Sequence, residues 1–297
     1  MDITTITEWI EQQKCVLVLG PDIAYNSQKS LLNELSTFVE TKRIKCNFNQ
    51  DEEFLSSTTK FSPLFNRQLF KFFETLKPSD IYRKIAEIPF HLFVSLSPDL
   101  LLKQTFEHKN FEYDFDFYHR NVNPQDVDKP TPQKPLIYNL LGEQTQCSSL
   151  VLCFNHLFDY LSSILGNYGL PENLRNEFKE TQSVFFLGFK YDKWYFKLIL
   201  RLLNFPELAL RQAAFEEVEN KEGIINFYTD EFNFVFLEDT TGEEIINSIH
   251  NYFSEKKELR KPKIYTQTAQ QITNIINVTG NDNIVAQDIK GNINVNK

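Results

Sequence analysis

The sequence predicts an α/β fold with a Rossmann-like, mostly parallel sheet and helices on both faces. Short continuous apolar runs, such as "CVLVLG" (15–20) and "SVFFLGF" (183–189), are typical of strands buried on both faces. Amphipathic segments with helical periodicity separate these runs, as crossover helices separate parallel strands. The 297 residues, 41% of them hydrophobic, are enough for one large domain with a substantial core.

The first third of the chain already alternates between the two kinds of element. Asp2 is a suitable cap for a first helix, because its side chain can accept a hydrogen bond from a helical amide. The expected elements are a helix over 2–13, a strand over 15–20, a helix over 27–42, helical sequence over 65–87 and a strand over 90–96.

The middle and end of the main domain continue this alternation after one irregular segment. Residues 108–135 are polar, aromatic and proline-bearing, which indicates a long excursion from the sheet containing a small hairpin. The elements expected after it are strands over 135–143, 148–154, 183–189, 223–229 and 232–238, and helices over 155–165, 171–181, 192–203 and 241–253. The basic run "KKELRKPK" at 256–263 is interpreted as a solvated linker.

The character of the sequence changes after Pro262. Residues 264–297 alternate Ile or Val with polar residues and contain Gly280 and Gly291, a pattern typical of strands joined by tight turns. We therefore divide the chain into a main domain (1–260) and a small C-terminal β appendage (264–297). An isolated hairpin is marginally stable, so the appendage is expected to pair with a second copy, with a partner or with its own domain. A disordered tail remains the alternative.

Charge and cysteine content narrow the functional classes. A net charge of −9 argues against a nucleic-acid-binding surface. The N-terminal residues lack the features of a signal peptide and no apolar run reaches the length of a membrane span, so a cytoplasmic protein without membrane contact is expected. The four cysteines, Cys15, Cys46, Cys147 and Cys153, lack zinc-ligand spacing, and Cys15 and Cys153 are interpreted as buried structural thiols.

A strand-to-helix turn at 95–99 is a natural place for functional groups, since ligands in α/β proteins bind at the carboxyl ends of the strands. Ser97 is a suitable N-cap for the following helix, and Pro98 suits the first helical position. Asp99 also favours a helix N-terminus because of its negative charge.

Four segments, taken in order, resemble the SIR2-like (sirtuin-like) family, in particular its bacterial branch found in antiviral defence proteins. They are "LVLGPDIA" (17–24), "FVSLSPDLLLKQ" (93–104), "PLIYNLLGEQTQCSSLVL" (135–152) and "VFFLGFKYDKWYFKLILRLL" (184–203). The resemblance covers about residues 1–255 and includes the late segment at 223–238. It implies an NAD site, with cofactor-binding positions at Gly20, Asp22, Ser97, Asp99, Gly142, Gly188 and Asp192.

The family's pattern is degenerate at the positions that carry chemistry. Ser97 stands where the family has an asparagine, and Leu141 stands where it has the histidine that acts as general base. Leucine cannot transfer a proton. At the phosphate loop, Pro21 lacks an amide donor and Asp22 brings a negative charge toward the pyrophosphate position.

The remaining histidines lie outside the motif and are interpreted as structural or exposed. They are His91, His108, His119, His156 and His250. Among them, His156 is the nearest candidate to replace the missing base. Asp192 is interpreted as a cap for the helix that begins near Trp194, and that helix belongs to the scaffold.

The resemblance and the substitutions together indicate a catalytically inactive SIR2-like module. We expect an assembly or signalling component of a bacterial antiphage defence system, in which residues 264–297 mediate oligomerisation or bind a partner. No cofactor is expected, unless the site still binds NAD or ADP-ribose. The alternative is an NAD-hydrolysing effector activated on oligomerisation, in which Asp99, Ser97 and Asp192 act with backbone amides after Gly20.

Overall fold

The computed structural model describes residues 3–23, 31–42, 46–49, 54–56, 63–166, 168–207, 209–214, 221–237 and 240–263. The appendage at 264–297 lies outside the described residues, so its β structure and its role in association stay predictions. The same holds for Asp2 as a helix cap.

A seven-stranded sheet forms the centre of the fold, with the order β5-β6-β4-β1-β7-β8-β9, and every neighbouring pair is parallel. Its strands are β1 (Cys15–Leu19), β4 (Leu92–Ser95), β5 (Asp114–Phe117), β6 (Leu136–Asn139), β7 (Ser183–Leu187), β8 (Leu210–Ala214) and β9 (Phe234–Leu237). A separate antiparallel pair joins β2 (Asn47–Asn49) to β3 (Phe54–Ser56). The parallel sheet confirms the predicted α/β class.

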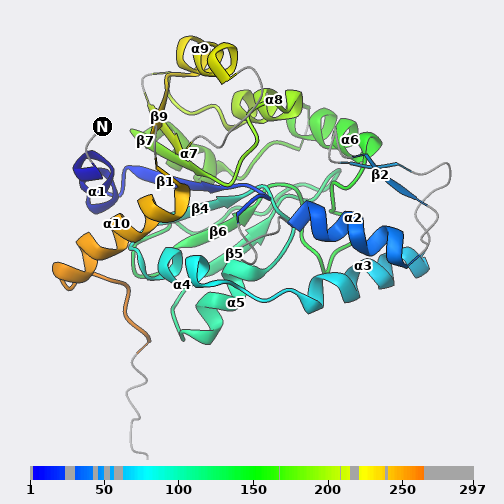
Figure 1. Ribbon diagram of the computed structural model, residues 1–297, viewed down its shortest axis with the longest axis horizontal. Helices are drawn as coiled ribbons and strands as arrows, with labels where there is room; N and C mark the ends of the chain where they lie inside the picture. The colour runs from blue at the N-terminus through cyan, green and yellow to red at the C-terminus, as the bar shows by residue number, and fades with distance from the viewer. Residues whose placement is uncertain are drawn as a thin grey trace, which may run out of the picture. The chain divides into compact units, whose positions relative to one another are not determined.

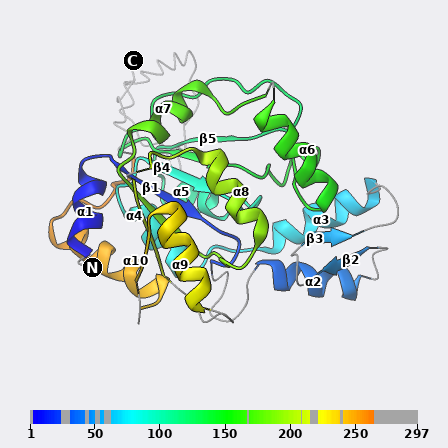
Figure 2. The ribbon, with the colours of Figure 1, turned by 90° about the horizontal axis from the view of Figure 1, so that it is seen from above.

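Helices cover both faces of this sheet (Figure 1; Figure 2). One face carries α1 (Ile3–Glu11), α2 (Leu31–Thr41), α3 (Pro63–Thr75), α4 (Asp80–Glu87), α5 (Leu101–His108) and α10 (Gly242–Glu255). The other carries α6 (Phe154–Leu165), α7 (Glu172–Glu180), α8 (Trp194–Leu203) and α9 (Lys221–Phe232).

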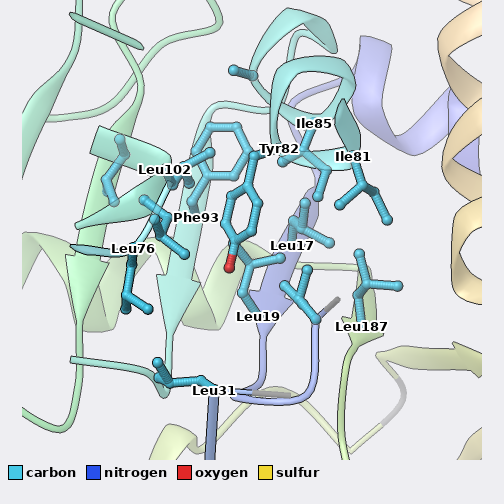
Figure 3. Close-up of a cluster of buried hydrophobic side chains, with 14 of the residues drawn as sticks. Leu17, Leu19, Leu31, Leu76, Ile81, Tyr82, Ile85, Phe93, Leu102 and Leu187 are labelled. Atoms are coloured by element: carbon cyan, nitrogen blue, oxygen red, sulfur yellow. The ribbon is translucent and has the colours of Figure 1, made fainter. Parts of the chain in front are cut away.

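Each central strand supplies side chains to both cores, because successive residues of a strand point to opposite faces. In β1, Leu17 and Leu19 belong to the core under α4, while Val16 and Val18 belong to the core under α8. Figure 3 shows the first of these cores, with Tyr82 of α4 lying over β1 and its hydroxyl directed toward Leu19. The strand must be apolar on both sides, which explains why its sequence is a continuous hydrophobic run.

Two predicted strands are wrong. Residues 223–229 lie within α9, where Ile224, Tyr228 and Phe232 follow at intervals of four and pack on one core. Residues 148–154 form no strand: Val151 donates a hydrogen bond to the Leu141 carbonyl at 3.1 Å, and Cys153 is the N-cap position of α6. Cys153 is also only half-buried, whereas Cys15 is fully buried as expected.

Three segments of the sheet and its surroundings differ from expectation. Residues 114–117, placed in an excursion with a hairpin, form the edge strand β5 and pair in parallel with β6. Strand β8, with its polar sequence "LRQAA", was not expected. The run at 256–263 is not a solvated linker throughout, because the guanidinium of Arg260 is buried and donates to the carbonyls of Ala86, Ile88, Phe90 and Pro132.

Candidate functional site

The carboxyl ends of β1, β4, β6 and β7 meet at the point where the chain changes direction across the sheet. Strands β4 and β6 lie on one side of β1, and β7 lies on the other. Parallel α/β sheets bind ligands at such a point, because the loops on either side diverge there. The turns at 20–23, 96–100, 140–143 and 188–191 follow these four strands.

The turns after β1 and β7 are bound closely to each other. The amide of Gly20 donates to the Leu187 carbonyl at 2.8 Å, and the amide of Asp22 donates to the Gly188 carbonyl at 3.0 Å. A Cβ atom on Gly20 would lie 2.0 Å from the Gly188 carbonyl oxygen, so only glycine permits this approach. Gly188 itself has a φ of 77°, which also favours glycine.

These hydrogen bonds reduce the number of backbone amides that the turn after β1 has available for binding a phosphate. The amides of Gly20 and Asp22 already serve carbonyl groups of β7 and its turn, and Pro21 between them has no amide hydrogen. The carboxylate of Asp22 is buried in the same turn, with Lys190 Nζ at 3.6 Å from Oδ1. The turn therefore combines fewer available donors with a buried negative charge.

A large apolar cavity lies beside these turns. It contains about 850 Å³ of empty space, part of it open to solvent. Its described walls come from α2, α3, the β2–β3 ribbon, α6, α8 and the turns after β1, β4, β6 and β7. The described lining residues are Pro21, Asp22, Leu31, Leu35, Phe48, Phe54, Leu55, Phe73, Leu96, Pro98, Leu141, Val151, Leu152, Leu157, Phe189, Lys190, Tyr195 and Phe196.

Leu141 faces this cavity, at the position where the family resemblance requires a general base. Among the described lining residues, Asp22 and Lys190 are the only charged ones, and they lie 3.6 Å apart. The apolar side chains of this wall can hold a hydrophobic group, but they cannot take a proton from a ribose hydroxyl or from water.

A second, much smaller cavity holds the polar residues of the site. Its described walls include Ser95, Ser97, Asp99 and Asn139, together with Gly20 and Tyr82. The Ser97 hydroxyl donates to Asp99 Oδ2, and the amide of Leu101 donates to Asp99 Oδ1 at 2.9 Å. Asn139 Nδ2 donates to the Asp99 carbonyl at 3.0 Å, which ties the end of β6 to the turn after β4.

Asp99, rather than Ser97, supports the start of α5. The helix begins at Leu101, and it is the Asp99 carboxylate that accepts the first helical amide, so the expected N-cap role of Ser97 and the helical position of Pro98 are wrong. Burial raises the pKa of Asp99, while hydrogen bonds from Ser97 and Leu101 oppose the increase. Burial, followed by the negative charge of Asp99, also raises the pKa of Tyr82.

The structure therefore separates Ser97 and Leu141, the two positions that were interpreted from the sequence as degenerate. Ser97 and Asp99 line the small polar cavity, whereas Pro98 and Leu141 line the large apolar one. Sequence analysis missed Asn139 and Tyr82, and it included Ser95 in the turn at 95–99 without giving it a role. Asn139 and Ser95 end buried strands, a position at which polar side chains reach the edge of a parallel sheet, so this signal could have identified them.

Gly142 and Asp192, two predicted cofactor-binding positions, do not belong to the described lining of either cavity. Gly142 has a φ of 90°, and a Cβ atom there would lie 2.4 Å from the Ser149 carbonyl oxygen. Asp192 is not the cap of α8, because Lys193 occupies that position and no side chain caps it. The Asp192 carboxylate lies 3.5 Å from Lys193 Nζ and is absent from the described lining of both cavities.

None of the five histidines lines either cavity, as far as the lining residues are described. Burial, with the nearby charge of Arg120, lowers the pKa of His156 to about 4, so its ring is neutral near pH 7. His119 contacts Ser148 at 2.9 Å. His91 lies 3.5 Å from Glu177 and His250 lies 2.7 Å from Glu87, while His108 is exposed at the end of α5.

Three further properties of the described residues concern metal-binding groups, membrane-spanning helices and the most buried thiol. No group of three or more histidine, cysteine, aspartate or glutamate side chains could hold a metal ion within the part of the chain that the structure describes. In the same residues, no helix combines the length and the apolar character needed to cross a bilayer. The buried thiol of Cys15 has its pKa raised to about 12 by burial, as befits a structural cysteine.

Comparison with known proteins gives a distant structural likeness. No family model matches the sequence, and no curated protein matches it either. The chain is similar to a solved structure described as "Structural Basis for the Mechanism and Regulation of Sir2 Enzymes", at 12% sequence identity and a TM-score of 0.41. The match covers 86% of this chain and 98% of the solved one. The fold class itself rests on the seven parallel strands described above.

Proposed function

We propose that this protein is a non-catalytic, Sir2-like module that acts as an assembly or signalling component of a bacterial antiphage defence system. In this proposal, residues 264–297 mediate oligomerisation or bind a partner protein. The defence role follows from the family resemblance of the sequence, and the association role follows from the strand-like alternation of the appendage.

One observation carries the proposal of inactivity: Leu141 faces an apolar cavity at the carboxyl ends of the strands. Chemistry at a ribose requires a group that can accept a proton near neutral pH. The described walls of this cavity offer the Asp22–Lys190 pair and otherwise uncharged, mostly apolar side chains. His156, the expected substitute, has a depressed pKa and does not belong to these walls.

The described residues of the first turn, 20–23, fit the pyrophosphate of NAD poorly. A dinucleotide needs free amides at its pyrophosphate, and here the amides of Gly20 and Asp22 are bound to carbonyls of β7 and its turn. A carboxylate a few ångström from a phosphate costs about 1–4 kcal/mol at typical effective dielectrics, which Lys190 reduces. The first turn therefore favours packing against β7 over binding a phosphate.

The polar cluster around Asp99 also supports a structural role. Its carboxylate already accepts hydrogen bonds from Ser97 and Leu101, and Asn139 is bound to its backbone carbonyl. Because these groups satisfy one another, they stabilise the turn between β4 and α5. A catalytic role for Ser97 and Asp99 would require the cluster to open toward a ligand.

The proposal is tested by measuring NAD consumption with the full-length protein, in dilute solution and in its assembled state. The products, nicotinamide and ADP-ribose, are separated and quantified by chromatography. Binding of NAD and of ADP-ribose is measured by calorimetry. We expect neither turnover nor binding. Turnover that Asp99→Asn abolishes would overturn the proposal and establish the NAD-hydrolysing alternative.

A gain-of-function arm tests whether the first turn alone is enough to prevent activity. Leu141→His and the double variant Ser97→Asn/Leu141→His restore the side chains of the family pattern. The matched control is Leu64→His, at an exposed leucine of α3. We expect all three to remain inactive, because the first turn still cannot bind the pyrophosphate.

The association role is tested with Val278→Lys/Ile293→Lys, which disrupts the apolar pattern of the appendage. Light scattering should show that this variant loses the higher assemblies.

A further inference from the structure

Helices α6 and α8 carry apolar side chains on their outward faces as well as on their buried faces. In α6, Leu157 and Tyr160 are buried in the core, yet Phe154, Phe158 and Leu165 are 46%, 49% and 72% exposed. In α8, Leu198 is 41% exposed and lies one turn after Trp194. Exposed apolar side chains that gather on neighbouring helices often mark an interaction surface.

The two outward stripes form one continuous surface. The rings of Phe154 and Trp194, at the starts of the helices, lie 5.7 Å apart, and Leu165 and Leu202, at their ends, line the same hollow. The starts of the two helices therefore lie together and so do their ends, which means that they run in the same direction; Figures 1 and 2 show α6 and α8 on the same side of the sheet. We call this surface, made of Phe154, Phe158, Leu165, Trp194 and Leu198, the α6–α8 face.

The size of the α6–α8 face fits a protein interface. Its four most exposed side chains present about 400 Å² of apolar area, taking about 200 Å² for each whole side chain. Exposed apolar patches of about 300–600 Å² on a monomer are often functional. A stable dimer buries about 800 Å² on each partner, so this apolar centre supplies about half and a polar rim supplies the rest.

The two ends of the face complement each other. At the C-terminal end is a hollow of about 1060 Å³, partly open to solvent, whose described charged residues are Arg175, Lys179 and Arg201. All three are basic, on a chain whose net charge is −9. At the N-terminal end, the exposed residue Asp192 precedes Trp194 by two positions, and the ring of Trp194 packs against that of Phe154.

We propose that the α6–α8 face is the interface of a homodimer with two-fold symmetry. An isologous interface must be self-complementary, because the same patch meets itself. With the axis near Phe158 and Leu198, the helices of the two copies run antiparallel. The aromatic N-terminal end of one copy then covers the hollow of the other, and Asp192 faces its basic rim. Phe154 and Leu165 are about 16 Å apart along α6, so the contacts at the two ends of the α6–α8 face form at the same time.

This interface is independent of the appendage, and the experiment separates the two. The mass of the full-length protein is measured by size-exclusion chromatography with light scattering over a wide range of concentration. We expect a dimer or a multiple of it. Phe158→Glu/Leu198→Glu should halve the mass of the basic assembly unit, whereas Leu64→Glu, at a 64% exposed leucine of α3, should not. Circular dichroism confirms that each variant is folded.

A charge exchange tests the antiparallel arrangement. Asp192→Lys and Lys179→Glu should each weaken the dimer at low salt, and the double variant should recover most of the loss, because the two positions face each other across the interface. The appendage variant Val278→Lys/Ile293→Lys should remain dimeric.

Four results would overturn the proposal: a monomeric wild type, an equal effect of the face variant and the Leu64 control, a monomeric appendage variant, or single charge variants whose losses simply add. Higher assemblies of the face variant that are built from units of half the mass would agree with this interface and with the proposed role of residues 264–297.

Discussion

Replacing Gly20 with alanine tests the contact that joins the turns after β1 and β7. The new Cβ would lie 2.0 Å from the Gly188 carbonyl oxygen and 2.9 Å from the Phe189 ring, both far inside van der Waals contact. The turns must move apart, which breaks the hydrogen bonds from Gly20 to Leu187 and from Asp22 to Gly188. Each buried group left unpaired costs about 1–3 kcal/mol, so we expect a loss of about 3–5 kcal/mol in the free energy of unfolding.

The measurement is urea unfolding followed by tryptophan fluorescence and circular dichroism, analysed by linear extrapolation. Gly169→Ala is the matched control, because nothing lies within 4 Å of a Cβ atom there and its φ is not in the left-handed region. We expect the control to change stability by less than about 1 kcal/mol. If Gly20→Ala and Gly169→Ala unfold at the same urea concentration, the close packing of the two turns is wrong.

Three further predictions concern buried polar groups. His156 has a pKa of about 4 in the folded protein against an ordinary 6.5, so the unfolded chain binds the proton first as the pH falls. The stability that the neutral ring contributes is complete above pH 6.5 and is lost toward pH 4. This loss is at most about 3 kcal/mol, at about 1.4 kcal/mol per tenfold change in proton affinity. Urea unfolding at several pH values should show a weaker dependence of stability on pH for His156→Gln than for the same change at exposed His108, the control. Arg260→Leu leaves four backbone carbonyls without their buried donor and should cost about 3 kcal/mol or more in urea unfolding, while the same change at exposed Lys261 should cost little. Cys15, fully buried with a pKa of about 12, should resist a thiol reagent until the protein unfolds, and mass spectrometry of labelled peptides would contradict this if Cys15 reacted in the native state.

The parallel sheet could be predicted because its central strands need apolar residues on both faces. The runs at 15–19, 92–95, 136–139 and 183–187 are such strands, and each was expected in place. Strand β8 was missed because its sequence, "LRQAA", includes Arg211, which is buried and donates to backbone carbonyls such as that of Phe232. A buried arginine satisfied in this way leaves no hydrophobic signal in the sequence.

The wrong strands have a common cause. Residues 223–229 and 148–154 contain aromatic and β-branched side chains that are typical of strands, but the helical spacing of Ile224, Tyr228 and Phe232 determines the outcome in α9. Conversely, β5 lies in a polar segment and joins the sheet through backbone pairing with β6 at its edge. At an edge strand, hydrogen bonding to one neighbour outweighs the local composition.

The sequence by itself determined the class of fold and what each side chain can do: leucine at 141 cannot transfer a proton, and serine at 97 offers one hydroxyl for hydrogen bonding. Only the tertiary structure decided that these two residues line different cavities and that Asp99 supports the start of α5. It also decided that Gly20 serves the packing of β1 against β7. The physical reason is that residue identity sets what a side chain can do, whereas contacts between distant segments set which neighbours it meets.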